Sequence, residues 1–116
     1  MAEPVYKVLT EAAFEEAERK GRFTGSADDS RDGFIHLSAA HQLDGTLAAH
    51  FAREAGLVLL AVDTSRLGPA LKWERSRGGA LFPHLYAPLD LAAVLWTKRL
   101  TLGEDERHIL PEGVLA

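Results

Sequence analysis

The spacing of apolar and polar residues predicts a strand and then a helix at the start of this chain. Residues 5–8, Val-Tyr-Lys-Val, alternate in the manner of a strand. Thr10 can serve as an N-cap, because its hydroxyl can accept a hydrogen bond from a free N–H of the first turn. Glutamates follow it, and Arg19 and Lys20 come near the end, as the helix dipole favours. We therefore expect a helix over residues 11–20, ended by Gly21.

A second helix is predicted after a polar loop and another strand. The loop covers residues 24–32, which are rich in turn formers, and the strand covers residues 33–38, Gly-Phe-Ile-His-Leu-Ser. Ser38 can cap a helix that runs to about residue 55, and apolar residues recur along it at helical spacing. Gly45 weakens this helix by about 1 kcal/mol relative to alanine, which leaves room for close packing or backbone approach there.

Strand patterns dominate the second half of the chain. Residues 57–63 are nearly all apolar, which is typical of a central strand buried on both faces. Residues 75–79 form a basic, glycine-rich loop, and Pro83 indicates an edge strand or a bend. Residues 103–116 are polar and are expected to form a peripheral tail. The other strands are expected at residues 72–74, 81–86 and 93–100. Two early helices followed by several strands predict an α+β fold with a mixed or antiparallel sheet.

Composition and charge limit the functions that this chain can have. Its 116 residues, 47% hydrophobic and 26% charged, predict one folded domain over residues 1–116. The formal net charge of −4 argues against nucleic-acid binding through bulk electrostatics, although a local basic patch and an RNA end as ligand stay open. Because the chain has no cysteine, a disulfide framework, a thiol nucleophile and a zinc–thiolate site are excluded.

The hydropathy pattern gives no sign of a membrane or secretion segment. No apolar run approaches the roughly 20 residues that span a bilayer. The first residues, Met-Ala-Glu-Pro, have neither the basic nor the apolar region of a signal peptide. We therefore expect a cytoplasmic protein without membrane contact. The sequence leaves its oligomeric state open.

His36 is the first candidate for a functional side chain. It should share one face of its strand with Phe34 and Ser38. An imidazole, a hydroxyl and free helix N–H groups would then meet in one place, which suits a ligand that carries phosphate or ribose. The equally weighted alternative is that Ser38 only caps the helix and His36 is a hydrogen-bonded sheet residue.

His84 is the second candidate, in the segment Phe-Pro-His-Leu-Tyr. On an ideal strand Phe82 and Tyr86 lie on its own side. An imidazole between two aromatic rings could stack on or hydrogen-bond a ring-shaped ligand. The alternative is a core histidine bonded to a backbone carbonyl. The residue pattern slightly favours a functional role.

Glu74 is the third candidate, at the end of Leu-Lys-Trp-Glu. A carboxylate at a strand end can act as a general base or stabilise positive charge that develops on a sugar carbon. The alternative is a weak surface ion pair with Lys72, Arg75 or Arg77. Taken by itself, the residue favours the ion pair.

A metal site built from His36, Glu74 and His84 is chemically possible, since imidazole and carboxylate are standard ligands. The sequence has no close-spaced ligand pair such as His-x-His or His-Glu-x-x-His to support it. An organic ligand is therefore the better hypothesis, and no metal is expected.

Three motifs together, Gly-Phe-Ile-His-Leu-Ser, Leu-Lys-Trp-Glu and Phe-Pro-His-Leu-Tyr, make the chain resemble a known family. It is similar to the small bacterial proteins called domain of unknown function 952, over nearly its whole length. That resemblance implies a fold similar to the ADP-ribosyltransferase fold, a split mixed sheet that holds NAD in a cleft, with two helices in the N-terminal half.

The resemblance also implies roles for individual residues, with NAD as a substrate. His36 and Ser38 match the motif that contacts the nicotinamide ribose and amide. Glu74 is the nearest counterpart of the glutamate that stabilises an oxocarbenium-like ribose, and His84 is the counterpart of the second histidine of RNA 2'-phosphotransferases. Tyr86 would stack on nicotinamide. Arg75 or Arg77 would reach a phosphate.

The leading hypothesis is therefore an NAD-using ADP-ribosyl or phosphoryl transferase, or a glycohydrolase. A second hypothesis is a non-catalytic module that binds a nucleotide or an ADP-ribose-like ligand. A third is an interaction domain whose histidines are satisfied in the core. The three differ in whether a small nucleotide-like ligand binds and whether it is consumed.

Overall fold

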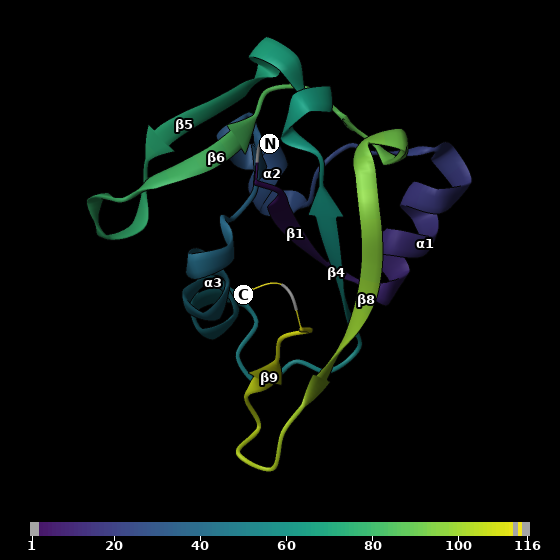
Figure 1. Ribbon diagram of the computed structural model, residues 1–116. Coiled ribbons are helices and arrows are strands. Elements are labelled where there is room, and N and C mark those ends of the chain that lie inside the picture. The colour runs from purple at the N-terminus through teal and green to yellow at the C-terminus, as the bar shows by residue number, and fades with distance from the viewer. Residues whose placement is uncertain (1–2, 113, 115–116) are drawn as a thin grey trace.

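The computed structural model describes residues 3–112 and residue 114. Its main sheet has four strands in the order β1-β4-β8-β9 (Figure 1). The strands are β1 (Val5–Thr10), β4 (Leu57–Val62), β8 (Val94–Leu102) and β9 (His108–Ile109). Every residue of β4 is buried, and β4 pairs with β1 on one side and β8 on the other. The prediction of a central strand buried on both faces is confirmed.

A second sheet has three strands in the order β3-β6-β5, and a third pairs β2 with β7. The strands are β2 (Arg22–Phe23), β3 (Ile35–His36), β5 (Leu71–Arg75), β6 (Leu81–Leu85) and β7 (Leu89–Asp90). A single antiparallel bridge between Tyr6 and Ser38 joins β1 to the segment after β3. All strand pairs among the described residues are antiparallel, so the α+β class and the antiparallel alternative are confirmed, while the mixed sheet implied by the family resemblance is wrong.

Pro83 lies in the middle strand of its sheet, so the expected edge position is wrong. β6 pairs with β5 along its whole length and with β3 at only two positions. Next to those positions, the Leu37 N–H donates to the Pro83 carbonyl at 3.0 Å. Proline has no N–H with which to return a second bond, and the pairing with β3 ends at this point.

The described residues form three α-helices, which are α1 (Glu11–Lys20), α2 (Ala27–Asp32) and α3 (Leu43–His50). The bounds of α1 are those predicted: the Thr10 hydroxyl accepts from the Ala13 N–H at 3.1 Å, and Gly21 ends the helix with φ of 79°. Short 3₁₀ turns cover Ala40–Gln42, Thr64–Arg66, Gly68–Ala70, Arg77–Gly79 and Leu91–Ala93.

α2 lies where a polar loop was expected, and that prediction is wrong. Ser26 and Asp29 form a reciprocal capping box, in which the Ser26 hydroxyl accepts from the Asp29 N–H at 3.2 Å and the Asp29 carboxylate accepts from the Ser26 N–H at 2.9 Å. This pair satisfies two otherwise free N–H groups of a helix of six residues. Gly33, in the left-handed conformation, ends the helix.

The second predicted helix is shorter than expected, and Ser38 is not its cap. A 3₁₀ turn comes first, and α3 ends at His50 instead of near residue 55. Here the Gln42 side chain accepts from the Ala39 N–H at 2.9 Å and donates to the Leu81 carbonyl at 2.7 Å. Gln42 thereby ties the start of the helix to β6. Arg53, with φ of 63°, interrupts any continuation.

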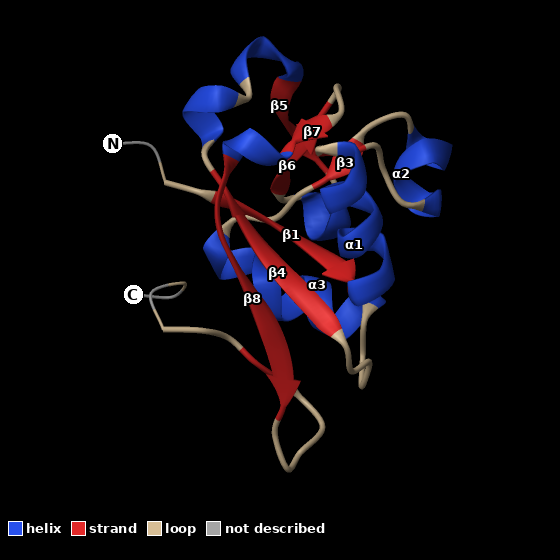
Figure 2. Ribbon diagram, turned by 90° about the vertical axis from the view of Figure 1, so that its right-hand side faces the viewer, coloured by secondary structure: helices blue, strands red, loops and turns tan. Residues whose placement is uncertain are grey.

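The main sheet is covered on both faces. Alternate residues of β4 enter two separate apolar clusters, with Leu60 on the face of α1 and Leu59 on the face of α3. Figure 2 shows α1 on one side of β1, β4 and β8 and α3 on the other. Among the described residues, no helix has the length and apolar character needed to cross a membrane.

The segment from residue 103 is more closely integrated than the expected peripheral tail. Its strand β9 pairs with the end of β8, and Leu110 packs against the apolar cluster beside α3. Val114 is only 3% exposed and belongs to the same cluster. Residues 113, 115 and 116 of this segment lie outside the described part of the chain.

Candidate functional site

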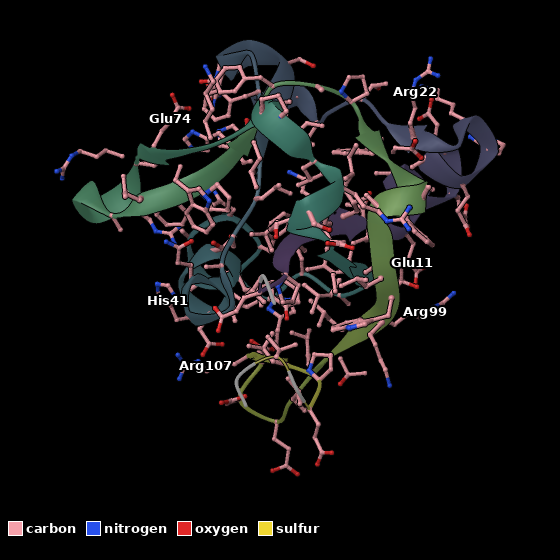
Figure 3. The ribbon with its side chains drawn as sticks, turned by 45° about the horizontal axis from the view of Figure 1, so that its top comes forward. Glu11, Arg22, His41, Glu74, Arg99 and Arg107 are labelled. Atoms are coloured by element: carbon pink, nitrogen blue, oxygen red, sulfur yellow. The ribbon has the colours of Figure 1, made fainter. Side chains whose placement is uncertain are left out.

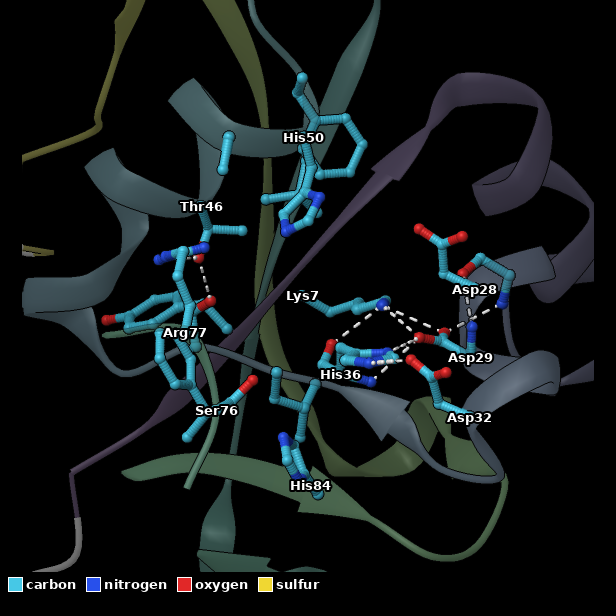
Figure 4. A pocket seen from close by; sticks show the side chains of 18 of the residues that line it. Lys7, Asp28, Asp29, Asp32, His36, Thr46, His50, Ser76, Arg77 and His84 are labelled. Atoms are coloured by element: carbon cyan, nitrogen blue, oxygen red, sulfur yellow. Dashed lines mark hydrogen bonds and ion pairs between the residues drawn. The ribbon is translucent and has the colours of Figure 1, made fainter. Parts of the chain in front are cut away.

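A pocket of about 410 Å³ lies between α2 and α3. Carboxylates of α2 form one wall, and Thr46 and His50 of α3 stand opposite, together with Arg77 from the β5–β6 loop (Figure 4). Lys7 of β1, His36 of β3 and His84 of β6 contribute the polar groups between the walls. Six segments of the chain therefore meet at this pocket.

A buried ion cluster joins β1, β3 and α2. The Lys7 ammonium lies 3.1 Å from Asp29 Oδ2 and donates to the His36 carbonyl at 2.9 Å. The His36 ring lies between two carboxylates, with Nδ1 2.6 Å from Asp29 Oδ1 and Nε2 2.9 Å from Asp32 Oδ2. Both bonds form together only when each ring nitrogen carries a hydrogen, because an ionised carboxylate only accepts. The cluster therefore holds the imidazole in one orientation.

Asp29 is the centre of this cluster. Its carboxylate also accepts the backbone N–H groups of Ser26 and His36, at 2.9 and 3.0 Å. Burial by itself raises the pKa of Asp29, but the bond from His36, the charge of Lys7 and the two backbone bonds outweigh it and hold the pKa well below its usual range. Asp29 is therefore an ionised carboxylate that is held by three residues, Lys7, Ser26 and His36.

Acid should weaken the fold through Asp29. Its pKa is lower in the folded protein than its ordinary value of 3.8, so the unfolded chain takes up the proton first as pH falls. The stabilisation is complete above a pH of about 4 and is lost as pH falls further, towards the folded pKa. Urea denaturation of the protein and of Asp29→Asn should therefore give free energies of unfolding that converge below about pH 4. A difference between the two free energies of unfolding that stays constant down to pH 2 would contradict this role.

His84 and Glu74 form a second pair next to this cluster. His84 Nδ1 lies 2.9 Å from Glu74 Oε1, and the Tyr86 hydroxyl donates to the same oxygen at 2.6 Å. His84 is 4% exposed and stacks on Phe34, with ring centroids 3.9 Å apart. Its other nitrogen, Nε2, is buried and has no hydrogen-bond partner among the described residues. A buried polar atom of this kind requires an explanation, and a ligand in the adjoining pocket is one.

Glu74 is an ionised acceptor for both neighbours. The bond from Tyr86 and then the bond from His84 lower the pKa of Glu74, and the same carboxylate raises the pKa of the Tyr86 hydroxyl. An acceptor at Nδ1 places the proton of a neutral imidazole on that nitrogen. Nε2 of His84 is then left with a free lone pair, which is the arrangement of a general base.

Comparison with known proteins places the chain in a family. The model described as "Protein of unknown function (DUF952)" matches residues 8–97. The chain belongs to this family. The crystal structure of protein CC0527 from Caulobacter crescentus, a structural genomics target, is 48% identical, covers 97% of this chain and 99% of its own, and has a TM-score of 0.92. The solution NMR structure of CC0527 is 51% identical, covers 90% of each chain and has a TM-score of 0.81. No curated protein matches.

The structure places only some of the predicted site residues of this DUF952 protein in the pocket. His36, Ser38, His84 and Arg77 line it. The rings of His36 and His84 lie 5.7 Å apart, so the two histidine motifs do meet in one place. Ser38 is buried and its hydroxyl lies 2.8 Å from the Thr46 hydroxyl.

The other three predicted residues do not line the pocket. Glu74 projects from β5 (Figure 3). It does not line the pocket, and it is linked to it through its contact with His84. Tyr86 is 44% exposed and lines a separate pocket of about 260 Å³ with Phe34. Arg75 donates to the Gly79 carbonyl at 3.3 Å within its own hairpin. Contacts of these three side chains with a ligand remain predictions. In the positions observed, none of the three side chains lines the pocket.

Sequence reasoning missed much of the DUF952 pocket. It did not select Lys7, Asp29, Asp32, Thr46 or His50 as site residues. Two signals could have found the cluster: a lysine inside an apolar strand must have a partner, and Ser-x-x-Asp at residues 26–29 is a capping-box pattern. Within residues 3–112 and 114, no group of three histidines or carboxylates is placed to hold a metal ion.

Proposed function

We propose that this pocket binds a nucleotide of the NAD class and that the protein is an NAD-using glycohydrolase or ADP-ribosyl transferase. The observation that carries the proposal is the buried Nε2 of His84, which has no partner among the described residues and is backed by Glu74 on the other side of the ring. His84 lines the pocket, and an oriented base beside polar groups that are mostly already bonded is suited to proton transfer from a bound reactant.

The size and charge of the pocket support a ligand of this kind. Its volume of about 410 Å³ lies within the usual range for small-molecule sites. Asp28 and Asp32 line one wall, while Arg77 lines the other. A ligand with a cationic ring and, one ribose away, a phosphate group is complementary to these walls. The nicotinamide ribose of NAD and the pyrophosphate attached to it have this distribution of charge.

In the proposed reaction the bond between ribose C1' and the nicotinamide nitrogen breaks, and its electron pair stays on nicotinamide. Water, or the hydroxyl of an acceptor, forms the new bond to C1' and gives its proton to Nε2 of His84. The carboxylates of Asp28 and Asp32 favour the positive charge that develops on ribose. Glu74 is the positioning residue that holds His84 in the required tautomer, and Ser38 offers a hydroxyl to the ligand.

The test is incubation of the purified protein with NAD, followed by chromatography of nicotinamide and ADP-ribose. We expect both products to accumulate together in water, or nicotinamide alone to accumulate when an acceptor takes the ADP-ribosyl group. The absence of nicotinamide release with water and with a set of protein and nucleic-acid acceptors would reject catalysis.

A second candidate is a binding module that does not consume its ligand. The position of Glu74 favours it, because the carboxylate expected to stabilise the ribose cation lies outside the pocket lining. An NMR titration with NAD and ADP-ribose separates the two candidates. Saturable shifts near His36 and His84 without release of nicotinamide would select the binding module. If neither ligand changes the chemical shifts, both candidates are rejected and an interaction domain is favoured.

A further inference from the structure

Arg77 is held at the pocket by contacts that do not neutralise its charge. Its guanidinium stacks over the Phe82 ring, 4.9 Å from the centroid, and Nη2 lies 3.4 Å from the Thr46 hydroxyl oxygen. Within the described part of the chain no carboxylate lies within ion-pair distance of Arg77. Arg31, on the opposite wall, instead pairs with Asp28 at 3.3 Å and Asp32 at 3.1 Å. Arg77 is therefore a pocket cation that remains available to an anion.

Gly45 makes room for this guanidinium. A Cβ added at Gly45 would lie 3.0 Å from Nη2 of Arg77, closer than ordinary van der Waals contact. The glycine thus lets the guanidinium lie directly against α3, although a glycine in a helix lowers its stability. The close approach that the sequence left open at Gly45 is confirmed, and the group that approaches is the side chain of Arg77.

Hydroxyl groups complete this wall. The Ser38 and Thr46 hydroxyls lie 2.8 Å apart and one donates to the other, which leaves one hydroxyl hydrogen to donate elsewhere. His50 follows Thr46 by one helical turn and lines the same wall, as does Ser76 next to Arg77. These side chains, together with Arg77, can donate hydrogen bonds, and none of them is a carboxylate.

We infer that this wall is an anion subsite, which takes a phosphate group of the ligand with Arg77 as its cation. The inference specifies the ligand of the proposed function and rests on it for the identity of the whole ligand. A guanidinium that forms charge-assisted bonds, with hydroxyls beside it, matches the acceptor oxygens of a phosphate. On the opposite wall Arg31 is already paired with Asp28 and Asp32, so a phosphate is favoured beside Arg77 and the ligand binds in one direction.

The test is an NMR titration with inorganic pyrophosphate, which carries the anion without the rest of NAD. Saturable shifts are expected at the amides of Thr46 and Arg77. Arg77→Gln should weaken pyrophosphate binding by about tenfold or more, because a charge-assisted bond is lost, while Arg77→Lys should keep part of the affinity. Arg75→Gln is the matched control, since Arg75 bonds within its own hairpin and does not line the pocket.

Gly45→Ala gives a variant that leaves the charge in place. Alanine should raise the thermal stability of α3 and at the same time weaken pyrophosphate binding by moving the guanidinium. Unchanged pyrophosphate affinity in Arg77→Gln, equal losses in Arg75→Gln, or shifts confined to the α2 wall would overturn the subsite. Arg77-dependent binding without nicotinamide release would keep the subsite and reject the NAD chemistry. Nicotinamide release that Arg77→Gln does not change would keep the NAD chemistry and reject the subsite.

Discussion

Replacing Asp29 with alanine should lower the free energy of unfolding by about 3–5 kcal/mol, which is the usual effect of removing one partner of a buried ion pair. The substitution leaves the Lys7 ammonium buried without its counter-charge, since Lys7 is 8% exposed. It also removes the acceptor of His36 Nδ1 and of the Ser26 N–H, and thereby half of the capping box of α2. The loss should be visible as a lower urea midpoint in circular dichroism.

Asp28→Ala is the matched control for this experiment. Asp28 lies next to Asp29 on α2, but its side chain is exposed and pairs with Arg31 at the surface. It should change the urea midpoint far less than Asp29→Ala does. Adding Lys7→Met to Asp29→Ala should recover part of the stability, because the orphaned charge is removed. Equal effects of the two aspartate variants would show that the ion cluster does not stabilise the fold.

Replacing His84 with glutamine should reduce nicotinamide release from NAD by about 10²–10⁴-fold, the usual contribution of a general base. The reason is specific to Nε2, the atom that is buried and unpartnered in the described structure. Glutamine retains hydrogen-bonding capacity at the site but is not a base at neutral pH. The rate should be measured at saturating NAD, so that a loss of binding is not mistaken for a loss of proton transfer.

Glu74→Gln tests the same pair without altering the imidazole. Its expected effect is a lower kcat with little change in KM, because Glu74 contacts His84 and does not line the pocket. NMR shifts of the His84 ring nitrogens should show a change in the proton distribution between Nδ1 and Nε2, which a purely structural role would not produce. His41→Gln is the control, since His41 is exposed at the surface (Figure 3). Full activity of both the Glu74 and His84 variants would remove His84 as the base.

The elements that could be predicted are those whose cause is local. The hydroxyl of Thr10 and the glycine after Lys20 set the two ends of α1, and a helix dipole acts within single turns. The apolar side chains of residues 57–62 are all removed from water when this segment forms a strand that is buried on both faces, and β4 is such a strand. The three histidine and glutamate motifs were likewise visible as polar groups in apolar surroundings.

The elements that were missed depend on partners elsewhere in the chain. α2 has only six residues, most of them polar, and no apolar period to reveal it. Its place is set by Asp29, which is held by Lys7 of β1 and by His36 of β3. Ser38 had the residue type of a cap, but its hydroxyl bonds Thr46 instead. Local pattern cannot choose between two such bonds, because both satisfy the same hydroxyl.

The sequence by itself determined the α+β class, the first helix, the buried central strand, the membership of the DUF952 family and the identity of the two histidine motifs. Only the tertiary structure decided which of these polar groups face the pocket. It placed Glu74 behind His84 and brought Arg77 against Gly45. The physical reason is that a buried charge or polar atom needs a partner, and the antiparallel pairing of strands decides which distant residue can supply it.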